Sequence, residues 1–189
     1  MAIKNLRSGN NRPVVLFDFD DVVVDCLDGV ITEWNKLNGT SFKKEDVDRW
    51  DIDGCLGKGA YQLFFKKGFF ENLKEKNGSI AVIQELIEST MYDLYIVTAC
   101  QSVQEIEEKI KWLQKHIPNF NINRFIACKE KHMVRGDILI DDRAANLDQC
   151  RKYMDCILYD MPHNRNTKKY VRIYKLSEVM EILNEFFYQ

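Results

Sequence analysis

The sequence lacks features that mark several whole classes of protein. Among its 189 residues, no apolar run approaches the length of a membrane-spanning helix. The stretch from Met1 to Arg12 is polar and basic and has no apolar segment, so it does not resemble a secretory signal. The formal net charge of −2 offers no basic excess for a nucleic-acid polymer. We therefore expect a cytoplasmic protein that binds neither a membrane nor a nucleic-acid polymer.

Cysteine and histidine patterns typical of metal sites are absent as well. No two cysteines have CxxC spacing, and several lie in or beside apolar runs. In a reducing compartment this predicts free, buried cysteines and neither disulfides nor zinc ligands. The six cysteines are Cys26, Cys55, Cys100, Cys128, Cys150 and Cys156. His116, His132 and His163 show no ligand spacing, and we assign none of them to catalysis.

The composition and the apolar pattern instead indicate a folded α/β domain. The chain is 46% hydrophobic and 30% charged, and its length suits one domain, or one domain with a small insert. Short β-rich runs alternate with stretches of helical periodicity, which predicts a parallel sheet between two layers of helices. Strands are predicted at residues 13–17, 94–97, 125–128, 138–140 and 156–159. Helices are predicted at 27–37, 80–89, from a capping box at 102–105 onwards, and around 179–186.

Residues 40–73 interrupt this alternation and have no clean period. They mix charged clusters with aromatic residues, among them Trp50, Phe64 and Phe65. We interpret the stretch as a small helical insert. Its aromatic residues fit two roles, the core of the insert or a surface on which a nucleobase stacks.

Polar residues with related chemistry follow four of the predicted strands. In a parallel α/β sheet, ligands bind outside the carboxyl ends of the strands. Asp18 and Asp20 are two residues apart in extended chain, so they project to the same side. The other strand ends carry Thr98-Ala99, the segment 128–131 with Lys131, and Asp141-Asp142.

These groups together favour phosphate chemistry. Converging carboxylates repel one another unless a cation neutralises them, and oxygen ligands in small number indicate Mg²⁺. Thr98 offers a hydroxyl donor and Lys131 a positive charge for a phosphate. A carboxylate nucleophile, a cation and a phosphate clamp predict phosphoryl transfer through an aspartyl-phosphate. Asp141-Asp142 could also cap a helix near Ala144, a role compatible with metal binding.

Four motifs in this order resemble those of the haloacid dehalogenase superfamily of phosphatases. The segment 14–20, VVLFDFD, resembles the first motif, and 96–98, ending in Thr98, looks like the second. Lys131 looks like the third, and 138–142, ILIDD, like the fourth. The resemblance covers the whole chain and implies a Rossmann-like three-layer core.

A closer resemblance is to the 5′(3′)-deoxyribonucleotidases of that superfamily. The segments that carry it are 68–73, GFFENL; 131–142, ending GDILIDD; and 159–165, YDMPHNR. The long gap between Asp20 and Thr98 fits a small helical cap at about 27–75, inserted after the first strand into a core of about 1–26 and 76–189.

The resemblance implies a role for each matching residue. Asp18 would be the nucleophile, and Asp20 would protonate the leaving oxygen and then activate water. Mg²⁺ would be held by Asp18, the main-chain carbonyl of Asp20 and Asp142, with Asp141 as the alternative carboxylate.

The phosphate would be bound by Thr98, Ala99 and Lys131. Lys129 is a nearby competitor for the lysine role, although spacing to Asp142 favours Lys131. Ala99 departs from the family pattern, since serine is common there.

Two further departures lie near the first motif. Asp21 stands where the superfamily usually has glycine, and Cys26 where relatives can place an aromatic residue near the base. A base pocket would then comprise Cys26 together with the cap aromatics Trp50, Phe64 and Phe65.

The function expected from the sequence is hydrolysis of nucleoside 5′-monophosphates with Mg²⁺. Two alternatives stay open: a phosphatase for another small monoester such as a sugar phosphate, and a catalytically silent binding protein with the same fold. The oligomeric state is not predicted.

Overall fold

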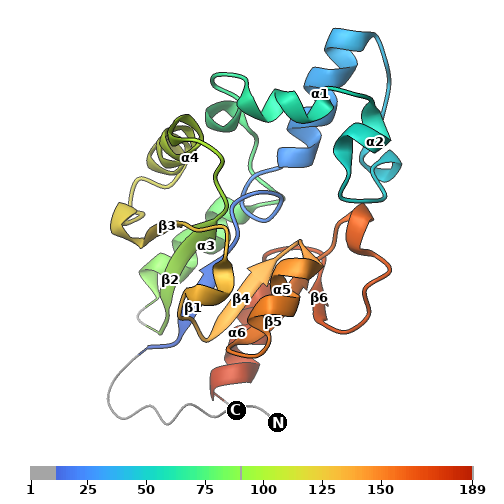
Figure 1. Cartoon of the computed structure of the whole chain (residues 1–189). Helices are drawn as coiled ribbons and strands as arrows, with labels where there is room; N and C mark the ends of the chain where they lie inside the picture. The colour runs from blue at the N-terminus through green and yellow to red at the C-terminus, as the bar shows by residue number, and fades with distance from the viewer. Residues whose placement is uncertain (1–11, 90, 189) are drawn as a thin grey trace.

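Six parallel strands form one sheet in the computed structural model, which describes residues 12–89 and 91–188 (Figure 1). The strand order is β3-β2-β1-β4-β5-β6, as in Rossmann-like domains. The strands are β1 Val14–Phe17, β2 Asp93–Thr98, β3 Phe125–Ala127, β4 Ile138–Asp141, β5 Asp155–Tyr159 and β6 Val171–Ile173. This confirms the predicted parallel α/β sheet. The expectation about a secretory signal at Met1 to Arg12 falls almost entirely outside the described residues.

The central strand β1 explains why the sheet forms where it does. Val15 pairs with Leu94 of β2 on one side and with Ile138 of β4 on the other. Val15 and Phe17 belong to the large apolar cluster on one face of the sheet, and Leu16 belongs to the smaller cluster on the other. A strand buried on both faces must be apolar throughout, which is why it is a continuous run in the sequence.

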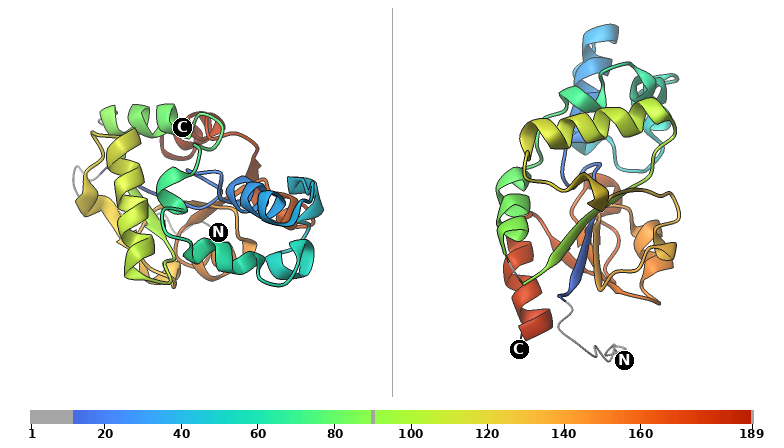
Figure 2. Two further views of the ribbon diagram at one scale, coloured as in Figure 1. Left: turned by 90° about the horizontal axis from the view of Figure 1, so that it is seen from above. Right: turned by 90° about the vertical axis from the view of Figure 1, so that its left-hand side faces the viewer.

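Helices cover both faces of the sheet. In Figure 2, α3 and α6 lie on one face and α5 lies on the other. The α-helices are α1 Cys26–Asn38, α2 Ile52–Leu56, α3 Ser79–Glu88, α4 Val103–His116, α5 Ala144–Cys150 and α6 Glu178–Tyr188. In the described part of the chain, no helix is both long enough and apolar enough to cross a membrane.

The segment between β1 and α3 contributes no strand to the sheet. It holds α1, α2 and three short 3₁₀ helices, η1 Lys44–Asp46, η2 Ala60–Phe65 and η3 Phe70–Asn72. It lies beyond the carboxyl ends of the strands (Figures 1 and 2). We call it the cap and keep 27–75 as its proposed bounds. The helix predicted from Leu27 ends at Gly39, whose φ of 63° is left-handed backbone that glycine adopts without strain.

Several finer expectations need correction. Strand β6 was not predicted, because its three residues follow a polar stretch and present no apolar run. The capping box is only half formed: Ser102 accepts a hydrogen bond from the Glu105 N–H, but the Glu105 carboxylate accepts from Gln101. All six cysteines are free, as expected, but only Cys26 and Cys150 are fully buried. Three more 3₁₀ helices occur: η4 Ile122–Arg124, η5 Lys131–Met133 and η6 Pro162–Asn164.

Candidate active site

Asp18 lies directly after β1, at the centre of the carboxyl edge of the sheet. Its main-chain N–H donates to the Ile140 carbonyl (2.9 Å), which ties this turn to β4. Its Oδ1 accepts hydrogen bonds from the Phe19 N–H (2.7 Å) and lies 2.8 Å from Lys131 Nζ. Burial raises the pKa of Asp18 well above its usual value, although Lys131 acts against that shift. The carboxylate is thus buried and fixed through a single oxygen.

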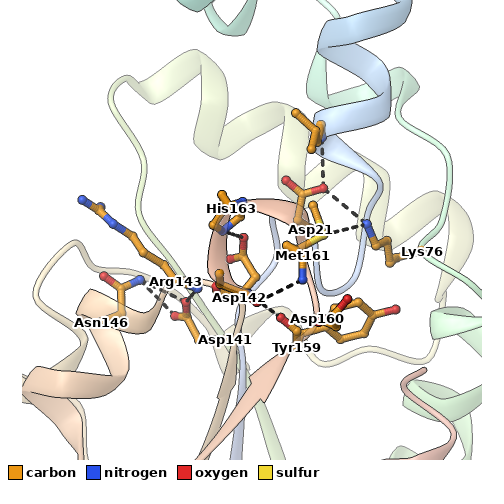
Figure 3. A network of polar contacts seen from close by, with 12 residues as sticks. Asp21, Lys76, Asp141, Asp142, Arg143, Asn146, Tyr159, Asp160, Met161 and His163 are labelled. Atoms are coloured by element: carbon orange, nitrogen blue, oxygen red, sulfur yellow. Dashed lines mark hydrogen bonds and ion pairs between the residues drawn. The ribbon is translucent and has the colours of Figure 1, made fainter. Parts of the chain in front are cut away.

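Asp141 and Asp142 end the neighbouring strand β4 but have different partners (Figure 3). Asp141 accepts from Lys131 Nζ (2.6 Å), from the Arg143 N–H (2.8 Å) and from the Asn146 amide. Both of its oxygens are therefore engaged, and it holds the turn into α5. It does not cap this helix as weighed from the sequence, because the N-cap residue is Arg143 and no side chain caps α5. Asp142 Oδ2 is buried, makes no hydrogen bond within the described residues, and lies 3.2 Å from His163 Nε2.

Three carboxylates converge closely enough to share a metal ion. Asp18, Asp141 and Asp142 each offer an oxygen, and these oxygens lie within 4.8 Å of one another. Burial raises the pKa of Asp142, although His163 opposes the shift. Lys131 is the cation that contacts two of the three. A further positive charge with oxygen affinity fits this cluster. Asp142 Oδ2, which accepts no hydrogen bond in the described part of the chain, is better placed to bind it than Asp141, whose two oxygens both accept hydrogen bonds.

Asp20 and Thr98 are joined by a lysine on α4. The Nζ of Lys109 donates to Asp20 Oδ2 (2.7 Å), to Thr98 Oγ1 (2.9 Å) and to the Ala99 carbonyl (3.1 Å). Burial alone would lower the pKa of Lys109, but its acidic neighbours, Asp20 first, hold it above the usual value. Thr98 itself is fully buried at the end of β2.

Asp21 occupies the position where the superfamily pattern has glycine. Its φ of 56° is left-handed backbone, which glycine adopts most readily. An aspartate tolerates this conformation better than most residues when its short side chain finds a local partner. Asp21 Oδ1 accepts from the Leu27 N–H (3.0 Å) and lies 3.5 Å from Lys76 Nζ (Figure 3). These contacts are the physical reason that the departure is accommodated.

A cavity of about 200 Å³ opens between these strand ends and the cap. Its lining includes Asp20, and Cys26, Trp50 and Phe64 of the predicted base pocket. Phe65 does not line it: its side chain is exposed and its ring packs against Tyr61 at 5.8 Å. The structure thus brings three of the four predicted pocket residues to one cavity.

Trp50 is the cap residue that meets the core at this cavity. The Arg143 guanidinium lies 4.6 Å from its ring centre, and the His163 ring meets it edge-on at 5.0 Å. Trp50 is nevertheless 55% exposed. An exposed aromatic ring that is held from two sides can still offer surface to a ligand.

The two lysines considered for the phosphate site, Lys131 and Lys129, lie in different surroundings. Lys131 contacts Asp18 and is buried, whereas Lys129 is exposed and lines the cavity. Sequence reasoning missed Lys109 and His163. Lys109 carried a weak signal, a lysine one turn after Glu105 on the inner side of α4. His163 lies within the segment 159–165 that resembles the deoxyribonucleotidases, but an isolated histidine has no ligand spacing of its own.

Comparison with solved structures defines the class of the fold. A haloacid dehalogenase-like family hydrolase from Streptococcus pneumoniae is similar, with a TM-score of 0.60 and 16% identity over 91% of this chain and 98% of that one. A haloacid dehalogenase-like protein from Agrobacterium tumefaciens has a TM-score of 0.62 and 12% identity, over 93% and 99%. The chain has a haloacid dehalogenase-like fold.

A family model assigns the chain more narrowly than the fold does. The family model described as 5′ nucleotidase, deoxy (pyrimidine), cytosolic type C protein matches residues 12–186. The chain belongs to this family and is a phosphatase of the 5′-nucleotidase type.

Curated relatives agree with this assignment. A 5′(3′)-deoxyribonucleotidase of Bacillus subtilis (strain 168) is 29% identical over 171 residues, which are 89% of this chain and 96% of the relative. A 5′(3′)-deoxyribonucleotidase of Clostridium acetobutylicum is 27% identical over 183 residues, covering 93% and 99%. This chain therefore spans nearly the full length of these relatives.

Proposed function

We propose that this phosphatase hydrolyses deoxynucleoside monophosphates, with Asp18 as the nucleophile and Mg²⁺ as the cofactor. The observation that carries the proposal is the fixed position of the Asp18 carboxylate. Its Oδ1 is held by the Phe19 N–H and by Lys131, while Oδ2 accepts no hydrogen bond within the described residues. Oδ2 is thus the oxygen available to attack phosphorus, forming an O–P bond as the bond from phosphorus to the ester oxygen breaks.

The metal ligands that we propose are Asp18, the main-chain carbonyl of Asp20, and Asp142. Asp142 is favoured over Asp141 because both oxygens of Asp141 are already engaged. When bound, Mg²⁺ would offset the charge of the carboxylates and of the phosphate during transfer. His163, next to Asp142, would orient that carboxylate.

The phosphate would be held by Lys131, Thr98 and the main chain at Ala99. Lys131 contacts Asp18 in the structure, so a phosphate that reaches Asp18 also reaches this charge. Asp20 would give a proton to the leaving ester oxygen. It would then take a proton from the water that cleaves the aspartyl-phosphate, which releases inorganic phosphate, restores the carboxylate of Asp18 and returns Asp20 to its protonated form.

The cavity between the core and the cap would hold the nucleoside. Trp50 and Phe64 supply aromatic surface, and stacking on an aromatic side chain contributes about 1–3 kcal/mol per base in single-strand binders. Cys26 supplies no ring at its side of the cavity, so we expect room for purines as well as pyrimidines. The substrate class is a small nucleotide and not a polymer, and we propose that it is met in the cytoplasm.

A panel of phosphate monoesters with Mg²⁺ tests this proposal. It should contain deoxynucleoside and ribonucleoside 5′- and 3′-monophosphates, sugar phosphates, phosphoglycolate and p-nitrophenyl phosphate. We expect the highest kcat/KM for a deoxynucleoside monophosphate. If a sugar phosphate exceeds every nucleotide, the nucleotidase proposal is wrong. If no ester is cleaved, the protein is the silent binder considered from the sequence.

A further inference from the structure

Lys109 is a buried lysine that none of the four superfamily motifs contains. It comes from α4, whose outer face carries exposed lysines such as Lys111. The Lys109 side chain is completely inaccessible to solvent. The rings of Phe19 and Phe70 flank its ammonium group at 5.6 and 4.6 Å, one from the core and one from the cap.

The contacts of Lys109 converge on the proposed general acid. Asp20 Oδ2 lies 2.7 Å from its Nζ, and this is the one hydrogen bond found for the Asp20 carboxylate in the described part of the chain. Asp20 Oδ1 is buried and has no partner there. The orientation of this carboxylate therefore depends on Lys109. Lys109 is fully buried while the Asp20 side chain is 30% exposed, so the pair is partly shielded from water and the attraction is stronger than that of a surface pair.

Lys109 also contacts the groups that face the phosphate. Its Nζ donates to Thr98 Oγ1 at 2.9 Å and to the Ala99 carbonyl at 3.1 Å. Glu105, one turn earlier on α4, lies 2.9 Å from the same nitrogen and forms a second ion pair with it. One cation thus sets the distance between the carboxylate of Asp20 and the end of β2.

We propose that Lys109 is a positioning residue, which holds Asp20 in the orientation needed to protonate the leaving ester oxygen. This inference rests on the proposed function, in which Asp20 is the general acid. Lys109 is not among the proposed ligands of the phosphate or of the metal, and it acts through Asp20. In the step concerned, the proton passes from the Asp20 carboxyl group to the oxygen whose bond to phosphorus breaks, and Asp20 is left as a carboxylate facing Lys109.

Two esters with different leaving groups distinguish a positioning role of Lys109 from a purely structural one. A nucleoside or other alcohol leaves poorly as an alkoxide and needs a proton, whereas p-nitrophenolate is a stable anion that leaves without one. The parameter kcat/KM covers only the steps up to loss of the first product, so hydrolysis of the aspartyl-phosphate does not enter it. A lysine that only stabilised the fold would affect both esters equally.

The experiment compares kcat/KM for the best nucleotide of the panel and for p-nitrophenyl phosphate, with Mg²⁺. Lys109→Met keeps the length of the side chain and removes the charge. We expect a loss of about 100-fold for the nucleotide and of less than about fivefold for p-nitrophenyl phosphate. Lys111→Met, on the exposed face of the same helix, is the matched control and should change neither value.

A double-mutant cycle with Asp20→Asn checks that Lys109 acts through Asp20. In the Asp20→Asn background, Lys109→Met should lower kcat/KM for the nucleotide by less than about threefold, because the residue it positions is already disabled. If circular dichroism shows that Lys109→Met does not fold, Lys109→Gln takes its place in both backgrounds. Its amide keeps a donor, so the selective loss should be smaller but still confined to the nucleotide.

Two outcomes overturn the inference. One is an equal loss for the two esters, and the other is an undiminished effect of Lys109→Met when Asp20 is already asparagine. Wild-type protein that cleaves neither ester would instead contradict the proposed function. If a sugar phosphate proves the better substrate, it replaces the nucleotide as the alkyl ester and the comparison keeps its meaning.

Discussion

The carboxyl edge of the sheet and the cap differ in how firmly their side chains are held. At the sheet edge, Asp18, Lys131 and Asp141 are buried and joined by contacts of 2.6–2.8 Å. In the cap, Trp50 and Tyr61 are 55% and 42% exposed, and ring contacts rather than ion pairs surround them. The first region is held by buried ion pairs, while the second is held by ring contacts and keeps part of its aromatic surface exposed.

The proposed function gives separate tasks to the two regions, and these tasks fit the difference. Phosphoryl transfer needs a nucleophile placed with sub-ångström accuracy, which strand ends of a buried parallel sheet provide. Recognition of a nucleoside needs apolar surface, and short helices such as α2 and η2 provide that with less constraint. Substitutions at the sheet edge should therefore abolish all activity, and substitutions in the cap should change selectivity.

The largest effect should follow Asp18→Asn, which keeps the shape of the side chain and removes the attacking anion. We expect turnover of every monoester to fall by at least about a thousandfold, with the fold retained. Activity on nucleotides and on p-nitrophenyl phosphate, measured beside circular dichroism, checks this. A folded Asp18→Asn protein with near-normal activity would exclude an aspartyl-phosphate mechanism.

Metal dependence should separate Asp142 from Asp141. Activity should vanish in EDTA, return with Mg²⁺, and be poorly supported by Ca²⁺, whose looser coordination misplaces the reacting groups. Asp142→Ala should raise the Mg²⁺ concentration for half-maximal activity by at least about 100-fold, and Asp141→Ala by less than about tenfold. Titration of activity with Mg²⁺ measures both values. The reverse order of the two variants would assign the metal to Asp141.

The same contrast explains what could be predicted from the sequence. The sheet edge was predictable because apolar strands are visible as runs and their ends must meet at one edge. The strand ends that carry Asp18, Thr98, Lys131 and Asp142 were located in this way, and the structure brings Lys131 into contact with Asp18. The preference for Lys131 over Lys129 and for Asp142 over Asp141 came from the family resemblance. Lys109 carried only a weak signal, its spacing from Glu105, because its contact with Asp20 depends on how α4 packs over the sheet edge, and local periodicity does not show such packing.

The cap was harder to predict for a related reason. Apart from α1, its helices are one or two turns long, too short to show a periodic pattern, so only a helical insert could be expected for residues 40–73. Whether an aromatic residue of the cap faces the core or the cavity depends on tertiary packing. Phe70 is buried while Phe65 is exposed, although both lie in aromatic pairs of similar appearance.

A moderate and selective effect should follow Trp50→Ala in the cap. Loss of a stacking surface should lower kcat/KM for the nucleotide by about tenfold, within the range expected for one aromatic contact to a base. Hydrolysis of p-nitrophenyl phosphate should stay within about twofold, because this ester needs only the phosphate site. Tyr174→Ala, which removes an exposed aromatic residue next to β6, is the matched control. Equal losses on both esters would mean that Trp50 supports the catalytic groups through Arg143 and His163.

The smallest effect should follow Gly39→Ala at the end of α1, a change of stability that leaves activity intact. Nothing lies within 4 Å of a Cβ at this position, so the cost comes from the left-handed backbone alone, about 1 kcal/mol.

Thermal unfolding of the Gly39→Ala variant tests whether the cap unfolds separately from the sheet. Buried side chains form one continuous cluster from β1 into the cap, and the buried Glu108 of α4 accepts hydrogen bonds from the Gly68 N–H (2.6 Å) and the Phe70 N–H (3.1 Å). These contacts predict a single cooperative transition, whose midpoint Gly39→Ala lowers by a few degrees. Thermal unfolding followed by far-ultraviolet circular dichroism and by tryptophan fluorescence, with Trp50 and Trp34 on the cap side and Trp112 on α4, should give coincident curves. If fluorescence shifts while circular dichroism keeps the wild-type midpoint, the cap opens on its own, and its looser side chains then belong to a separately unfolding unit.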